Sequence, residues 1–98
     1  MVTVNVKSAS GDVDTVKELI LEGLKEEKKR IEFALERTTS IVKAYEEKYG
    51  ISTSVFIEKF KRGEIEENDD TFDWWAEAKM SNELLEKIHT IANIEICR

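Results

Sequence analysis

The longest helical pattern in the chain covers residues 14–49, which include no proline and one glycine. Apolar and small residues recur there at steps of three and four, as on one broad apolar stripe of a helix. The stripe consists of Ile20, Leu24, Ile31, Ala34, Thr38, Ile41 and Tyr45, flanked by Leu21, Leu35, Val42 and Tyr49. The pattern predicts one long helix over residues 12–49, with Asp12 or Asp14 as its N-cap.

This predicted helix is long for a chain of 98 residues. At 1.5 Å per residue it would measure about 54 Å, more than the width of a compact domain of this size. We expect the rest of the chain to leave part of the stripe uncovered, so that a second copy or another protein buries it. The predicted dimer interface consists of Ile20, Leu24, Ile31, Leu35, Ile41 and Val42.

Apolar and polar residues alternate over residues 2–7, which predicts a short N-terminal strand followed by a turn that extends to residue 11. A single strand needs a partner. The partner is either the tail, residues 94–98, where Ile94 and Ile96 also alternate, or the same strand of a second subunit.

A short second helix is predicted over residues 52–62. Gly50 suits the left-handed end of the long helix, and Ser52 is a good N-cap for the next one. Phe56 and Phe60 share one face, and Gly63 ends the element. A helix this short should fold back on the long one as a helical hairpin.

A segment rich in carboxylates follows, and we interpret residues 64–71 as an acidic loop. Six acidic residues and no basic residue occur between positions 64 and 73, namely Glu64, Glu66, Glu67, Asp69, Asp70 and Asp73. Their spacing lacks the central glycine and final glutamate of a calcium-binding EF-hand loop, so no metal site is predicted. Asp70 is the expected N-cap of the next helix, with Asp73 reaching back.

The third helix is predicted over residues 72–93. Its expected inward face consists of Trp75, Ala78, Leu85, Ile88 and either Ala92 or Ile91. Adjacent helical residues point about 100° apart, so Trp74 and Trp75 cannot both face one narrow seam. Either both close the end of the bundle around Phe56 and Phe60, or one of them binds a partner. The chain as a whole is predicted to be one mainly α domain over residues 1–98, with a dimeric assembly.

Composition narrows the class of protein. The net charge of −6 disfavours nucleic acid as the main partner and suits a basic one. Abundant Glu, Lys and Ile with no Gln or Pro resembles the composition of thermophile proteins. The single cysteine, Cys97, excludes an intrachain disulfide, and no apolar run suits a signal peptide or a membrane span. We therefore expect a cytoplasmic protein without membrane contact.

No catalytic pattern stands out. His89 is the only histidine and has no evident helpers, and the hydroxyls of residues 52–54 are explained by helix capping. No glycine-rich phosphate loop or paired-cysteine zinc spacing occurs. The sequence predicts a protein that is not an enzyme and needs no cofactor.

The middle of the chain resembles a family of small prokaryotic antitoxin-like proteins, long-helix chains encoded beside a small toxin. The similar positions are residues 45–52 (YEEKYGIS), Phe56, Phe60, residues 63–65 (GEI) and residues 72–74 (FDW) with Ala76. Trp75 departs from the small residue expected there. The resemblance implies a non-catalytic module that neutralises a toxin with a basic surface, for example one that acts on RNA.

We expect the recognition surface to combine the acidic segment with the aromatic start of the third helix. Carboxylates without counter-charges can steer a basic partner, and an outward tryptophan is a frequent interface anchor. The predicted partner-binding residues are Glu64, Glu66, Glu67, Asp69, Asp70, Trp74 and Trp75.

Two alternatives remain at this stage. The order of predicted elements, a strand followed by two helices, is similar to that of ribbon-helix-helix DNA-binding regulators. The second of these helices opens at residues 50–54 and carries the basic residues Lys59, Lys61 and Arg62. The intervening helix is about three times too long for that class, and the chain is net acidic. The other alternative is a structural helical dimer.

Overall fold

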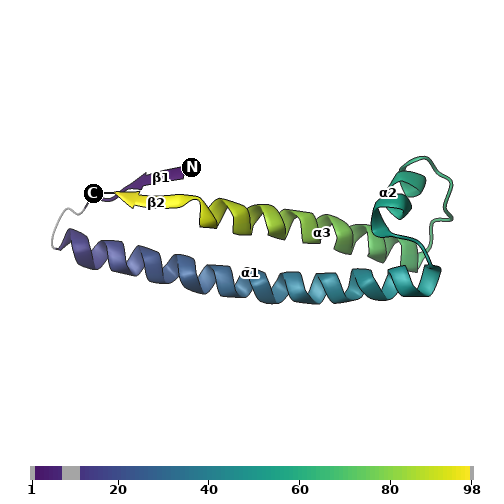
Figure 1. The fold of residues 1–98 in the computed structure, drawn as a ribbon, viewed down its shortest axis with the longest axis horizontal. Coiled ribbons are helices and arrows are strands. Elements are labelled where there is room, and N and C mark those ends of the chain that lie inside the picture. Colours follow the sequence, from purple (N-terminus) through teal and green to yellow (C-terminus); the bar gives the residue numbers. More distant parts are fainter. Residues whose placement is uncertain (1, 8–11, 98) are drawn as a thin grey trace.

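The computed structural model describes residues 2–7 and 12–97 of the chain (Figure 1). Two long helices, α1 (Val13–Tyr49) and α3 (Asp69–Ala92), pack side by side and run in opposite directions. The short helix α2 (Thr53–Lys61) lies at the end where the chain passes from α1 to α3. The predicted mainly helical fold, with α3 folded back on α1, is confirmed.

Two short strands lie at the opposite end of the helical pair. They are β1 (Val2–Asn5) and β2 (Ile94–Cys97), which pair in parallel with Val2 opposite Ile94 and Asn5 opposite Cys97. The tail of the same chain is therefore the strand partner that the sequence left open. The pairing is parallel because β1 runs in the direction of α3, and the α1 to α3 hairpin carries the chain back (Figure 1). The turn predicted before residue 12 lies outside the described residues.

The ends of α1 follow from local chemistry. The Asp12 carboxylate accepts a hydrogen bond from the Asp14 backbone N–H at 2.9 Å, so Asp12 is the N-cap. At the other end Gly50 has φ of 66°, a left-handed conformation in which glycine has no steric penalty. Both ends agree with the prediction. Ser52 then caps α2 by accepting from the Val55 N–H at 3.3 Å.

The start of α3 differs from the prediction. Asn68 is the N-cap, and it forms a reciprocal pair with Thr71: the Asn68 amide oxygen accepts from the Thr71 N–H, and the Thr71 hydroxyl accepts from the Asn68 N–H. This arrangement satisfies two backbone donors at once. Asp70 as the N-cap was wrong, and Asp69 and Asp70 belong to the first turn of the helix rather than to a loop.

The inward face of α3 also differs from the prediction. Trp74 and Leu84 are buried, with 1% and 7% of their surfaces exposed, whereas Leu85 is 51% exposed and Trp75 is partly exposed. Trp74 and Trp75, like Leu84 and Leu85, are adjacent apolar residues about 100° apart on the helix, and the sequence alone did not show which member of each pair faces α1. The first member of each pair is buried, and Ala78, which was predicted to face inward, is buried as predicted.

The molecule is thin and elongated. Its principal extents are 59 × 22 × 17 Å and its radius of gyration is 19.1 Å, against about 13 Å for a compact domain of this length. Among the described residues, six hydrophobic side chains are buried: Val6, Ile31, Phe56, Trp74, Ala78 and Leu84. A single pair of helices has one mutual face, which explains why the core is small.

Candidate functional site

Three elements meet at one end of the rod, which we call the junction: the last turns of α1, helix α2 and the first turns of α3. The Trp74 ring lies parallel to Phe56, with centroids 3.8 Å apart, and its ring N–H donates to the Thr53 hydroxyl at 3.1 Å. The rings of Tyr45 and Tyr49 stack on Trp74, each at 5.7 Å. These aromatic side chains form the packed centre of the junction.

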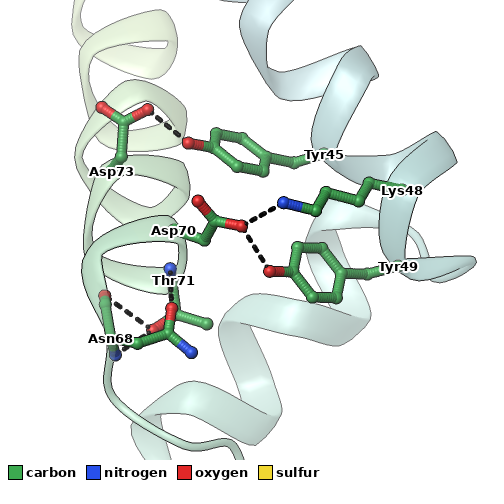
Figure 2. Close-up of polar contacts among 7 residues, drawn as sticks. All are labelled: Tyr45, Lys48, Tyr49, Asn68, Asp70, Thr71 and Asp73. Carbon is green, nitrogen blue, oxygen red and sulfur yellow. Dashed lines mark hydrogen bonds and ion pairs between the residues drawn. The ribbon is translucent and has the colours of Figure 1, made fainter.

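Polar contacts join α1 to the start of α3 (Figure 2). The Tyr45 hydroxyl donates to the Asp73 carboxylate at 2.6 Å, and the Lys48 ammonium pairs with Asp70 at 2.6 Å. The Tyr49 hydroxyl donates to the same Asp70 oxygen. Figure 2 shows the side chains of the two helices pointing toward each other across this seam. Two of the six acidic side chains are therefore used inside the chain.

These contacts change the proton affinities of the groups involved. The hydrogen bond to Asp73 and partial burial raise the pKa of Tyr45 to about 12. The hydrogen bonds from Lys48 and Tyr49 lower the pKa of Asp70 below its ordinary value. Those bonds also raise the pKa values of Lys48 and Tyr49. Each shift favours the protonation state that holds the two helices together at neutral pH.

The acidic segment is fixed to α3 through its backbone. The buried Thr71 hydroxyl donates to the Glu66 carbonyl oxygen at 2.9 Å, in addition to its role in the cap. Glu64 and Glu66 also line a groove of about 310 Å³, together with the apolar residues Ile51 and Ile65. The segment is therefore held in place while its side chains remain outside.

Four carboxylates of this segment remain available. In the part of the chain that the structure describes, Glu64, Glu66, Glu67 and Asp69 are exposed and none of them forms an ion pair. Asp70 is different, because its carboxylate accepts hydrogen bonds from Lys48 and Tyr49. The predicted acidic site thus divides into an outer group of four and an inner group that supports the fold.

Aromatic side chains reach the surface beside the acidic segment. Phe60 stacks on Phe56 at 5.4 Å, and Phe72 contacts its edge at 5.8 Å. Trp75 lies 6.4 Å from Phe60, and the Lys79 ammonium is 5.4 Å from the Trp75 ring centroid. We call Phe60, Phe72 and Trp75 the aromatic surface. Phe72 is 50% exposed, and Trp75 and Phe60 are partly exposed, with Phe60 stacked on the buried Phe56.

Both tryptophans were predicted to belong to the partner-binding surface. Trp74 is buried inside the junction, and Trp75 is the one that faces outward. The residues predicted for the dimer interface lie on the face of α1 that α3 covers. Ile31 is buried and Ile20, Leu24, Leu35, Ile41 and Val42 are half-buried within the single chain. The chain's own α3 therefore covers much of the stripe that was assigned to a second copy.

Phe72 was not among the residues that the sequence predicted for the candidate site. It was visible as an apolar residue directly after the acidic segment, but its exposure depends on the rotation of α3. The Asn68 cap had a stronger signal, since an asparagine three residues before a threonine suits a reciprocal cap. The competing run of aspartates hid that signal.

The comparisons with known proteins found no match to this chain among family models, curated proteins or solved structures. Among the described residues, no group of three or more His, Cys, Asp or Glu side chains is placed to hold a metal ion. None of the described helices combines the length and apolar character required to cross a membrane.

Proposed function

We propose that the chain is a non-catalytic protein-binding module of the antitoxin type, which acts as a homodimer and neutralises a toxin with a basic surface. The observation that carries this proposal is that four exposed carboxylates without ion pairs among the described residues lie at the same end of the molecule as an exposed aromatic surface. The resemblance of residues 45–76 to antitoxin-like chains supports the same function.

The outer carboxylates supply the electrostatic part of the proposed recognition. Unpaired acidic groups on one edge raise the encounter rate with a basic partner and reject acidic ones. Because the backbone of Glu66 is already fixed by Thr71, binding costs little ordering of the segment. Residues of this kind mainly set how fast the complex forms.

The aromatic surface supplies the proposed anchor. Tryptophan is enriched among the residues that carry most of the energy of an interface. The Trp75 ring lies 6.4 Å from the Phe60 ring and 5.4 Å from the Lys79 ammonium, and these contacts restrict its motion before a partner binds. Phe72 adds apolar area next to it.

The charge part is tested by co-purifying the tagged chain with the product of the neighbouring open reading frame. Glu64→Gln, Glu66→Gln, Glu67→Gln and Asp69→Asn together should slow association and remove most of its salt dependence. The matched control makes Glu18→Gln, Glu22→Gln, Glu32→Gln and Glu36→Gln on the exposed face of α1, an equal change of charge. Equal slowing by the control set, or failure of the parent chain to retain that product, would overturn the proposal.

The anchor is tested in the same complex. Trp75→Ala should weaken binding by about 30-fold, corresponding to about 2 kcal/mol for a lost interface tryptophan. Phe33→Ala is the control, since Phe33 is an aromatic residue of α1 with 77% exposure, far along the helix from the junction. Cells that express the toxin should grow slowly with the first variant and normally with the second.

The two alternative functions have less support. In ribbon-helix-helix regulators strands pair as a ribbon that reads the major groove, whereas β1 is paired in parallel with β2 of the same chain and α1 has 37 residues. Salt-sensitive binding to the chain's own promoter, lost in Lys7→Glu, would favour that alternative. A purely structural dimer would leave the outer carboxylates and Trp75 without effect in the experiments above.

A further inference from the structure

The sheet at the strand end of the rod is open on both sides. β1 pairs with β2, and among the described residues no third strand joins them. Each strand therefore has one edge whose backbone groups have no partner in the sheet. Apart from the pairing with β2, no backbone hydrogen bond between described residues involves residues 2–7. In Figure 1 β2 lies between β1 and α1, so the open edge of β1 faces away from the helices.

The open edge of β1 lacks the features that keep strands apart. Proteins often protect such an edge with a charged residue or a proline. The residues of β1, Val2–Asn5, include neither, whereas β2 carries Glu95. The side chains of Thr3 and Asn5 are exposed, and a sheet of two strands gains stability from a further strand. This edge is therefore an interaction surface for another extended segment.

The sequence of β1 matches an antiparallel copy of itself. Valine alternates with a polar residue over Val2–Asn5, so the two faces of the strand differ. Residues that lie directly opposite each other in an antiparallel pair point to the same face. With Val4 opposite Val4 of a second copy, Thr3 of each chain lies opposite Asn5 of the other. The valines then share one face of the joined sheet, and the polar side chains share the other.

The distribution of charge favours contact between two copies at this end. Residues 1–30 contain six basic and six acidic residues, and residues 83–98 add two basic and three acidic ones. By contrast, residues 64–77 at the junction contain seven acidic residues and no basic one. Two copies therefore repel each other least where their strand ends meet.

The direction of β1 keeps the junctions of such a pair apart. β1 runs along the rod in the same direction as α3, so the β1 strand of an antiparallel copy points the opposite way (Figure 1). The two rods, each 59 Å long, then extend from the shared sheet in opposite directions. Both acidic segments and both aromatic surfaces lie far from the contact.

We propose that two copies of the chain associate through the open edges of their β1 strands, which pair antiparallel with Val4 at the two-fold axis and form one sheet of four strands. This inference deepens the homodimer of the proposed function and rests on it, but not on the identity of the toxin. The paired edge is short, so the dimer belongs to the weak, transient class and forms at high micromolar concentration.

Two double variants test the edge on the purified chain by sedimentation equilibrium. Thr3→Lys with Asn5→Lys places like charges opposite each other twice in the dimer and should raise its dissociation constant about tenfold, although each copy becomes less negative. Thr3→Lys with Asn5→Glu is the matched control, since opposite charges then face each other and the dimer should persist. Thr3 lies opposite Glu95 within the chain, so a lysine there suits the β1–β2 pair in both variants.

A parent chain that stays monomeric up to millimolar concentration would overturn the proposal, and so would equal dissociation constants for the two double variants. Cross-linking tests the register. In a Cys97→Ser background, a mixture of Thr3→Cys and Asn5→Cys chains should form a disulfide between copies under mild oxidation. Asp69→Cys, an exposed position at the junction, should not, and preferential cross-linking there would reject the strand-edge contact.

Failure of this interface and failure of toxin recognition give different results. A monomeric chain that still retains the product of the neighbouring open reading frame would reject the strand-edge dimer alone. A chain that dimerises as described but does not retain that product would reject the toxin recognition alone.

Discussion

The two ends of the rod are built in different ways. The junction unites α1, α2 and α3 around the fully enclosed rings of Trp74 and Phe56. The strand end has two strands of four residues each. Among the described residues before α1, Val6 is the one buried hydrophobic side chain. Because burial of apolar area is the main source of stability, we expect the junction to be the more stable end.

The largest effect should come from Trp74→Ala. The change removes a buried ring that contacts four other aromatic or hydroxyl side chains, and we expect a loss of about 3–5 kcal/mol in the free energy of unfolding. Urea unfolding followed by far-ultraviolet circular dichroism measures it. Trp75→Ala serves as the control and should cost less than half as much. A similar cost for both variants would contradict the division between inner and outer tryptophan.

The matching change at the strand end is Val6→Ala. We expect a loss of about 1–2 kcal/mol, since two methyl groups leave a buried site with few neighbouring elements. Both tryptophans lie at the junction, so their fluorescence does not report on this end. The dichroism signal should therefore begin to fall before the fluorescence changes. Coincident transitions would indicate that the rod unfolds as one unit.

The cap of α3 gives a third, smaller effect. Asn68→Ala removes the acceptor for the Thr71 N–H and should cost about 1 kcal/mol in thermal or urea unfolding. Asn68→Ser, which keeps a capping oxygen, should restore most of the loss. If Asn68→Ala has no effect on unfolding, Asn68 does not cap the helix.

The smallest effect concerns pH. The chain has two tyrosines and both are at the junction, so tyrosinate absorbance reports only on that end. Because the pKa of Tyr45 is raised from 10.0 to about 12, its contribution to stability is complete below pH 10 and is lost as the pH rises toward 12. Asp73→Asn should shift the titration of Tyr45 back toward its ordinary value. A parent chain whose tyrosines both titrate near pH 10 would contradict the contact.

The lowered pKa of Asp70 affects stability at acidic pH instead of alkaline pH. Its contribution is present above the ordinary value of 3.8 and is lost as the pH falls through the lowered value. Acid unfolding of Asp70→Asn should therefore depend less on pH in that range than that of the parent chain. The same substitution at exposed Asp69 provides the control.

Local chemistry decided which parts of the fold the sequence predicted. Asp12, Gly50 and Ser52 act within one turn of the chain, so the ends of α1 and the start of α2 followed from their identities. The rotation of α3 is set by distant contacts such as that of Tyr45 with Asp73, and no local pattern contains them. For that reason Leu85 was assigned to the inside, although 51% of its surface is exposed.

The acidic segment shows the same limit at the candidate site. Its six carboxylates look equivalent in the sequence, yet Asp70 and Asp73 are bound by residues more than twenty positions away while four others remain free. Composition predicted an acidic surface but could not show which carboxylates are bound within the chain and which are exposed. Trp75 was one of two candidates for the outward ring, and only the packing of Trp74 against Phe56 distinguished them.

The pairing of β1 with β2 has a consequence for the order of folding. Val2 and Ile94 are about 90 residues apart, so closing that loop from an unfolded chain costs about 4 kcal/mol in entropy, more than a four-residue strand pair returns. Once α1 and α3 are docked, the ends are already neighbours and most of that cost has been met. The strands should therefore pair late, after the transition state, and changes in β1 should speed unfolding while leaving the folding rate nearly unchanged.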